Sequence, residues 1–337
     1  MSKVLLIGPN FHYFIQCIKH GLETNGCDVE VEMYDDPIHP YNALNKLRYK
    51  FAQDKDNAKL RSRKAWKSYI EQRWMSINPD IVFVVNGSNL MPESVELFAT
   101  KSKVAFWLFD SITRFTYLVE NLSFAHNVFC YEKGDIPILK EKYGIEASFL
   151  SQAVDTTLYF PLATEKKYDI AFAGDIFHSE KRQQLLKAVV NAFPDKKLCF
   201  YGIAVPWYKG VWKWLTRKHR DIYVNRNGSC FELNFLYNAS RVVLNIHIEQ
   251  QTDGANPKVY EIAATGAYQI CDRNDYIEKL FPNEEIGLYS NEEELISCIS
   301  KALEAESLNG DAAYKLVTTG HTFEVRMKEM LSKIQQE

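Results

Sequence analysis

Short apolar runs alternate with longer helical patterns along the whole chain, and this alternation restricts the possible fold more than any other feature. The run KVLLIG at residues 3–8 is typical of a buried parallel strand, and the following HYFIQCIKHGLETNG has the apolar spacing of a helix that ends at Gly26. Similar strand-like runs occupy residues 80–87, 103–110 and 127–132. Strands that alternate with helices in this way predict parallel βαβ units in a doubly wound α/β sheet.

The strand pattern begins a second time in the C-terminal half of the chain. A polar stretch that contains proline, residues 151–167, has the composition of a linker, and YDIAFAGDI at residues 168–176 starts a new series of strands. A chain of 337 residues is long enough for two cores of about 150 residues each. We therefore predict two Rossmann-like domains, residues 1–158 and 165–315, followed by a C-terminal helix in residues 316–337.

Charge and cysteine usage exclude several classes of protein. The net charge of -3 does not favour a protein that coats nucleic acid. The seven cysteines form no C-x-x-C pair, the N-terminal sequence lacks the pattern of a signal peptide, and no run approaches about 18 apolar residues. We expect a cytoplasmic protein without a membrane span and without a nucleic-acid partner.

The segment NPKVYEIAATGAYQICD, residues 256–272, carries the features of a nucleotide site. Pro257 suits the first turn of a helix, so Lys258 and Glu261 project from the same side near its N-terminus. A helix N-terminus attracts phosphate, Lys258 adds a positive charge, and a carboxylate one turn deeper can accept two hydrogen bonds from a ribose. Gly266 is expected to adopt the left-handed conformation that ends the helix. The alternative for Glu261 is an acid that only complements the helix dipole.

The spacing of two acids around this segment resembles that of a known enzyme class. Asp253 and Glu261 have seven residues between them, as do the two glutamates of GT-B glycosyltransferases of family 4 and their relatives, with aspartate in place of the first glutamate. The stretches DIAFAGDIFHSEKRQQLL, LYNASRVVLNIHIEQ and GHTFEVRMKEML occur in an order similar to that of CgeB-like glycosyltransferases, the spore-maturation and polysaccharide-locus family. The resemblance covers about residues 100–335. It implies a GT-B fold, in which two Rossmann-like domains face a cleft and a C-terminal helix crosses back to the N-terminal domain.

The resemblance also implies residues that bind the diphosphate of a nucleotide-sugar donor. Gly174 ends a strand and would let a ligand approach closely, and Lys181 and Arg182 open the following helix, where the family keeps basic residues. The alternative for the two cations is a solvated start of a helix.

The remaining donor residues surround the same segment. The resemblance assigns Glu261 to the ribose and Asp253 to the donor sugar. His247 follows a strand just upstream of Asp253, and we predict a contact with sugar or phosphate, with a structural histidine as the alternative.

The base that activates an acceptor hydroxyl is expected from the N-terminal half. His12 lies in the turn after the first strand, and Asp110 ends the later strand VAFWLFD. This arrangement resembles the His–Asp dyad of inverting GT-B enzymes, in which a carboxylate orients the imidazole. A capping role for His12 and an acceptor-binding role for Asp110 stay open, as does a retaining reaction in which His12 only positions the acceptor.

Two basic stretches contain aromatic residues. Residues 45–74 fit a solvated helix, with contact at a membrane surface as the alternative. Residues 205–220 place three Trp among Lys and Arg, a combination that suits either peripheral contact with a membrane surface or an aromatic loop that packs against the cleft. The one Asp-x-Asp sequence, at residues 54–56, lies inside the first basic stretch. We therefore expect no metal and no cofactor.

Together these features predict a metal-independent glycosyltransferase. It would move a sugar from a nucleotide-diphosphate-sugar donor to a hydroxyl of a glycan, lipid-linked or protein acceptor, in bacterial surface polysaccharide or glycoconjugate biosynthesis. Two alternatives stay open: a nucleotide-sugar 2-epimerase on the same fold, and a non-catalytic module that binds sugar nucleotides.

Overall fold

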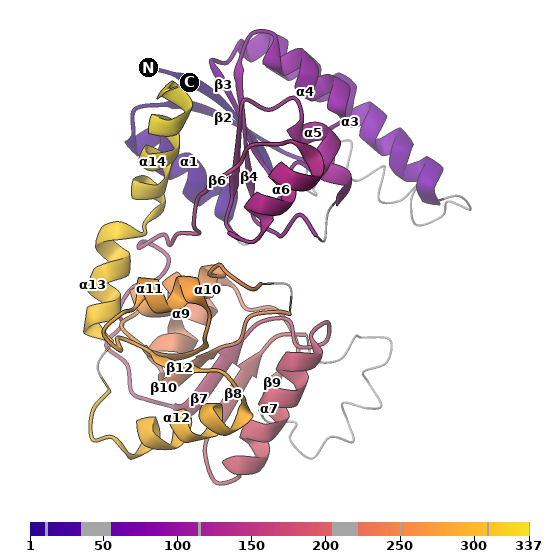
Figure 1. Cartoon of the computed structure of the whole chain (residues 1–337). Coiled ribbons are helices and arrows are strands. Elements are labelled where there is room, and N and C mark those ends of the chain that lie inside the picture. The colour runs from indigo at the N-terminus through magenta and orange to yellow at the C-terminus, as the bar shows by residue number, and fades with distance from the viewer. Residues whose placement is uncertain are drawn as a thin grey trace. The chain divides into compact units, whose positions relative to one another are not determined.

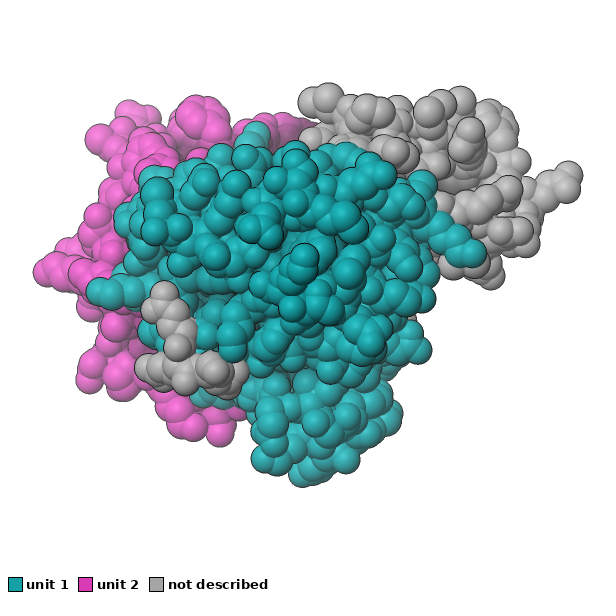
Figure 2. Space-filling view, turned by 90° about the horizontal axis from the view of Figure 1, so that it is seen from above, with its two compact units in different colours: residues 1–151, 323–337 teal, residues 152–322 magenta. Residues whose placement is uncertain are grey.

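The structure is a computed structural model that describes residues 1–10, 13–34, 55–113, 116–203, 222–249, 251–308 and 310–336 (Figure 1). The chain forms two compact units (Figure 2). The first unit consists of Met1–Ser151 and Phe323–Glu337, and the second consists of Gln152–Thr322. His12 and residues 205–220 lie outside the described residues.

The described strands of the first unit form a six-stranded parallel sheet in the order β2-β1-β3-β4-β5-β6. The strands are β1 (Lys3–Gly8), β2 (Asp28–Met33), β3 (Ile81–Val85), β4 (Lys103–Leu108), β5 (Asn127–Cys130) and β6 (Ser148–Phe149). The helices are α1 (Phe14–Thr24), α3 (Lys55–Ile77), α4 (Pro92–Ala99), the 3-10 helix Thr116–Leu118, α5 (Val119–Leu122), α6 (Asp135–Tyr143) and α14 (Phe323–Gln336).

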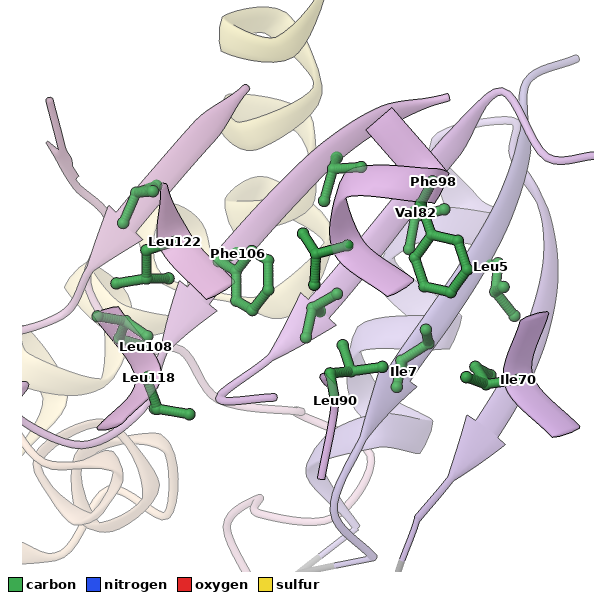
Figure 3. Close-up of a cluster of buried hydrophobic side chains, with 14 of the residues drawn as sticks. Leu5, Ile7, Ile70, Val82, Leu90, Phe98, Phe106, Leu108, Leu118 and Leu122 are labelled. Carbon is green, nitrogen blue, oxygen red and sulfur yellow. The ribbon is translucent and has the colours of Figure 1, made fainter. Parts of the chain in front are cut away.

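Apolar side chains on both faces of this sheet explain why its strands are almost continuously hydrophobic, since helices cover a parallel sheet on both sides. On one face Val82 and Phe106 pack with Phe98 of α4 and Leu122 of α5 (Figure 3). Trp66, Ile70 and Trp74 of α3 join the same core, so this part of the basic stretch 45–74 has one buried face.

The last helix, α14, packs against α1 on the other face of the first sheet. A Cβ atom added to Gly21 of α1 would lie 2.7 Å from the carbonyl oxygen of Phe323, so the close approach of the two helices requires glycine at this position. The chain thus returns to its first unit at the C-terminus, as the sequence predicts.

The described strands of the second unit form another six-stranded parallel sheet, in the order β12-β11-β10-β7-β8-β9. The strands are β7 (Tyr168–Ala173), β8 (Leu198–Tyr201), β9 (Tyr223–Val224), β10 (Ser240–Asn245), β11 (Tyr268–Asp272) and β12 (Gly287–Tyr289). The helices are α7 (Glu180–Ala192), α9 (Cys230–Asn238), α10 (Pro257–Ala264), α11 (Asp275–Leu280), α12 (Glu292–Glu304) and α13 (Asp311–Gly320).

The strand order of the second sheet defines where a ligand is expected. The chain runs outward from β7 through β8 to β9, returns to β10 beside β7, and continues outward through β11 to β12. Ligands of such sheets bind at the carboxyl ends of the strands where the order reverses, which here is the edge between β7 and β10. Helices α7 and α12 pack together on one face, and α10 contacts α9 and α13 on the other (Figure 1). The predicted doubly wound α/β architecture is confirmed in both units.

The segment predicted as a linker packs on α9 of the second unit. The side-chain oxygen of Asn234 accepts a hydrogen bond from the backbone N–H of Phe160 at 3.1 Å, and that of Asn238 accepts from the N–H of Leu162 at 2.7 Å. The Asn238 amide also donates to the carbonyl oxygen of Phe160 at 3.0 Å. These bonds fix the position of the neighbouring Tyr159.

None of the helices in the described part of the chain combines the length and the apolar character that crossing a bilayer requires.

Candidate functional site

Two glycines allow the ends of β7 and β8 to come together. Gly174 directly follows β7, and Gly202 directly follows β8 with a φ of +147°. A Cβ atom on Gly202 would lie only 1.7 Å from the carbonyl oxygen of Gly174. A Cβ atom on Gly174 would lie 2.9 Å from the ring of Phe172 and 3.2 Å from Nη1 of Arg182. Gly174 therefore serves close packing of the chain itself at the edge where a ligand is expected.

Arg182 is buried beneath this edge. Its side chain donates from Nε to the carbonyl oxygen of Ile246 at 2.8 Å and from Nη1 to that of Asp175 at 2.9 Å. Burial lowers the pKa of Arg182, and the nearby carboxylates of Asp272 and Asp175 oppose this effect. The guanidinium thus ties the chain after β7 to the chain after β10. Its predicted contact with a diphosphate stays a prediction.

Lys181, the neighbour of Arg182, points to a different partner. Its ammonium lies 2.5 Å from Oδ2 of Asp272, the last residue of β11, and its side chain is 36% exposed. Burial disfavours the charged form of Asp272, but His247 and Lys181 outweigh this effect and hold the pKa of that carboxyl well below its usual range. Asp272 is therefore a carboxylate at neutral pH.

His247 is 1% exposed, and both of its ring nitrogens have partners. Nδ1 lies 2.6 Å from Oδ1 of Asp272, and the backbone N–H of Asn256 donates to Nε2 at 3.1 Å. Because a backbone N–H can only donate, Nε2 must be the acceptor and Nδ1 must carry the proton. The surroundings therefore select one neutral tautomer of His247.

The buried trio of His247, Cys271 and Asp272 has the side-chain types of a metal site, with ligand atoms within 4.8 Å of one another. The proton on Nδ1 leaves that nitrogen no lone pair for a cation. Moving the proton to Nε2 would direct it at the N–H of Asn256. Burial and the charge of Asp272 raise the pKa of the Cys271 thiol well above its ordinary value. This trio is suited to hydrogen bonding and unsuited to binding a metal.

Helix α10 begins and ends as its sequence predicts. Asn256 is the N-cap, and its side-chain oxygen accepts a hydrogen bond from the N–H of Val259 at 3.3 Å. Pro257 is the first residue of the helix, and Gly266, just after the helix, has a φ of +71°. Asn256 also pairs with the side chain of Asn245 at the end of β10, at 2.9 and 3.2 Å. The N-terminus of α10 is thus anchored at the same sheet edge as Arg182.

Glu261 is 5% exposed, one turn inside α10. Burial raises its pKa, whereas the charge of Lys258 and a hydrogen bond with the Tyr159 hydroxyl lower it. Its Oε2 atom makes no hydrogen bond within the described part of the protein. Buried carboxylate oxygens normally have partners, so this atom marks a place where a ligand hydroxyl can donate.

Two tyrosines lie beside Glu261. The ring of Tyr159 stacks on that of Tyr237, with centroids 6.2 Å apart and planes inclined by 23°. Tyr237 is fully buried, and among the described residues its hydroxyl has no hydrogen-bond partner. Burial, and to a smaller extent the charge of Glu261, raises the pKa of the Tyr237 hydroxyl well above its usual value. The effect of this charge shows that Tyr237 lies near the Glu261 carboxylate. No motif in the sequence marks either tyrosine.

Asp253 and Lys258 flank the N-cap of α10. Asp253 lies in the loop between β10 and α10, and Lys258 lies in the first turn of the helix; both are half-buried. Lys258 is close enough to Glu261 for its charge to favour the carboxylate form.

A cavity of about 510 Å³ opens on the α7 side of the sheet edge. Its walls include Lys181, Asp272, Arg273 and Tyr289, whereas Lys258 and Glu261 do not line it. The exposed part of Lys181 is therefore accessible from this cavity. Glu261 and its neighbours Tyr159, Tyr237 and Lys258 form a part of the site that lies outside this cavity.

In the first unit Asp110 lies just beyond β4, at the carboxyl edge of that sheet. Asn86, which has a φ of +56°, accepts a hydrogen bond from the N–H of Phe109 at 2.7 Å and donates to Asp110 at 3.4 Å. The buried Asp135 accepts from the Ser111 hydroxyl at 2.7 Å. The orientation of Asp110 is thus supported, while His12 lies outside the described residues and the dyad stays a prediction.

Part of the chain matches a family of known proteins. Residues 181–332 match the model of a family described as glycosyl transferase-like, and this segment contains Lys181, His247, Lys258 and Glu261. No curated protein matches the chain significantly by sequence.

Solved structures similar to this one include a sucrose-phosphate synthase from Thermosynechococcus elongatus, at 13% identity and a TM-score of 0.69, covering 100% of this chain and 99% of that one. HepE of Anabaena, in complex with UDP and glucose, has 11% identity and a TM-score of 0.67 with full coverage of both chains (100% and 100%). The lipopolysaccharide outer core galactosyltransferase WaaB has 14% identity and a TM-score of 0.61, with 99% coverage of each chain. The chain therefore has the GT-B fold that the sequence predicts.

Proposed function

We propose that this protein is a GT-B glycosyltransferase that moves a sugar from a nucleotide-diphosphate-sugar donor to a hydroxyl acceptor. The observation that carries the proposal is Glu261, a buried carboxylate one turn inside α10, whose Oε2 has no hydrogen-bond partner among the described residues and whose charge is favoured by that of Lys258. The match of residues 181–332 to a glycosyl transferase-like family supports the same function.

The donor is held by groups at the edge between β7 and β10. The N-terminus of α10, with its positive end of the helix dipole, and the ammonium groups of Lys258 and Lys181 attract the diphosphate. Glu261 accepts hydrogen bonds from the ribose, and Asp253 faces the donor sugar. Negative charge grows on the diphosphate as the bond to the sugar breaks, so these cations favour the transition state over the ground state.

The nucleotide of the donor is proposed to be uridine diphosphate. The similar HepE structure contains UDP and glucose, which supports this choice. The ribose hydroxyls suit Glu261, because a buried carboxylate selects a ligand that can donate to both of its oxygens.

The acceptor side of the proposal lies in the first unit. His12 is the base if the reaction inverts, with Asp110 as the group that orients it, and the acceptor is a glycan, lipid-linked or protein hydroxyl. The similarity to a lipopolysaccharide galactosyltransferase supports a place in surface polysaccharide or glycoconjugate biosynthesis. A cytoplasmic location, catalysis without a metal and contact of residues 205–220 with the membrane surface belong to the same proposal.

The test is calorimetric titration of UDP, GDP, dTDP and CMP into the parent protein, followed by turnover assays with the sugars of the nucleotide that binds. We expect UDP to bind and the UDP-sugar to be consumed only when an acceptor is present. Conversion of the donor to its epimer without an acceptor would identify a 2-epimerase instead. Binding without turnover toward any acceptor would identify a binding module, and the absence of nucleotide binding would refute the proposal.

A further inference from the structure

Two helices start on either side of the edge between β7 and β10, and each carries one of the proposed diphosphate lysines. Lys181 lies in the first turn of α7, and Lys258 lies in the first turn of α10. One diphosphate can use both cations only if the two helix starts keep a fixed relative position. The contacts that hold them in this position therefore bear on binding.

A continuous chain of hydrogen bonds joins the two helix starts. Lys181 Nζ lies 2.5 Å from Oδ2 of Asp272, whose Oδ1 lies 2.6 Å from Nδ1 of His247. Nε2 of the same imidazole accepts from the N–H of Asn256 at 3.1 Å, and Asn256 is the N-cap of α10. The N–H of Asn256 selects the tautomer of His247 that can donate from Nδ1 to Asp272, so the two links at the imidazole depend on each other.

We propose that Asp272 and His247 are positioning residues of the donor site, which orient Lys181 and the N-terminus of α10 toward one diphosphate. This inference rests on the proposed function. His247 is 1% exposed, and both carboxylate oxygens of Asp272, which is 8% exposed, already accept hydrogen bonds within the protein, so the pair acts through Lys181 and Asn256. An ammonium has three N–H donors, and the one given to Asp272 leaves two for phosphate oxygens. The 36% exposure of the Lys181 side chain gives these donors access to a ligand.

The chemistry of position 272 requires a carboxylate. Oδ1 accepts from the imidazole and from the backbone N–H of His247 at 3.0 Å, while Oδ2 accepts from Lys181 and from the same N–H at 3.1 Å. An asparagine has one acceptor oxygen, so its NH₂ group must face either the ammonium or the Nδ1–H. Asp272→Asn therefore breaks one link of the chain while it preserves the volume of the side chain.

The experiment is a double-mutant cycle measured with two probes, UDP and uridine, on the full-length protein. The variants are Lys181→Met, Asp272→Asn and the two combined, with Asp275→Asn, an exposed aspartate of α11, as the matched control. We expect Lys181→Met to weaken UDP about tenfold or more and Asp272→Asn to weaken it roughly three- to tenfold. The double variant is expected to bind UDP as Lys181→Met does, because Asp272 acts through that lysine. Uridine affinity is expected to change less than twofold throughout.

The outcomes separate this inference from the proposed function. A parent protein that binds none of UDP, GDP and dTDP refutes the function and the inference with it. If the parent binds UDP and the losses of UDP affinity caused by Lys181→Met and Asp272→Asn add in the double variant, the inference alone is refuted. The inference is also refuted if these variants lose uridine affinity as much as UDP affinity. If Asp272→Asn does not fold, Asp272→Glu replaces it, since this variant keeps the charge and displaces it by one methylene. Unchanged UDP affinity in Asp272→Glu would likewise refute the positioning role.

Discussion

Replacement of Glu261 by glutamine is expected to increase stability and to weaken nucleotide binding. The Glu261 side chain is 5% exposed and its Oε2 makes no hydrogen bond in the described part of the protein. A buried polar group without a partner costs about 1–3 kcal/mol, and a neutral amide costs less than a charge. Because one kcal/mol corresponds to about 2–4 °C for domains of 150–250 residues, the variant should melt several degrees above the parent without ligand.

The pH dependence of this effect follows from the raised pKa of Glu261. The folded protein holds the Glu261 proton more tightly than the unfolded chain does, so this group lowers the free energy of unfolding as the pH rises through the ordinary glutamate range to the raised value. Above that value the cost is complete. The advantage of Glu261→Gln should therefore be small near pH 4 and grow as the pH rises through the raised pKa, as measured by thermal melts across this range.

Ligand binding should change in the opposite direction. A carboxylate that accepts from both ribose hydroxyls makes two charge-assisted hydrogen bonds, and glutamine can accept only one of them. We expect the dissociation constant of UDP to rise roughly 10- to 100-fold, because each tenfold step corresponds to about 1.4 kcal/mol. Glu293→Gln, the same change at an exposed position in the first turn of α12, is the control and should leave UDP affinity unchanged and lower stability by less than about 1 kcal/mol. A Glu261→Gln protein that is less stable at neutral pH, or that binds UDP as the parent does, would refute the reasoning.

Three further substitutions test the structural basis of the site. Gly202→Ala would place a Cβ atom 1.7 Å from the carbonyl oxygen of Gly174 and is expected to destabilise the protein by more than about 2 kcal/mol in chemical denaturation. Gly320→Ala, where a Cβ atom meets no other atom within 4 Å, is the control and should be neutral in the same assay. Arg182→Met leaves the carbonyl oxygens of Ile246 and Asp175 without their guanidinium donor and should cost about 2–4 kcal/mol in the same assay. An unchanged denaturation midpoint would contradict this structural role of Arg182. Tyr159→Phe removes the hydroxyl that donates to Glu261 and should further raise the pKa of that carboxyl, so UDP affinity should fall more in acidic than in alkaline solution. Equal losses across the pH range would argue against this contact.

Local sequence determined the parts of the site that depend on neighbouring residues. Asn256 before Pro257 marks the start of α10, and Gly266 marks its end, because capping and left-handed glycine conformations involve only a few consecutive residues. The alternation of apolar strands and helices likewise predicted two parallel sheets, since covering both faces of a parallel sheet demands that pattern. The alternation of strands and helices also predicted that Lys181 and Arg182 lie at the start of a helix.

The tertiary structure alone decided what these side chains do. Lys181 and Arg182 are adjacent in the sequence, but successive helical residues point about 100° apart. Lys181 therefore reaches Asp272 from the surface, whereas Arg182 is buried against carbonyl oxygens of the chain after β7 and after β10. The sequence around His247 does not predict that its partners are Asp272 and Asn256. Asp272 ends the neighbouring strand and Asn256 caps α10, so only the packing of these elements brings them to His247. Tyr159 lies in a segment with the composition of a linker, and only its docking on α9 places it against Glu261. Local patterns specify where a helix or strand begins, whereas the partners of a side chain are set by contacts between residues far apart in the chain.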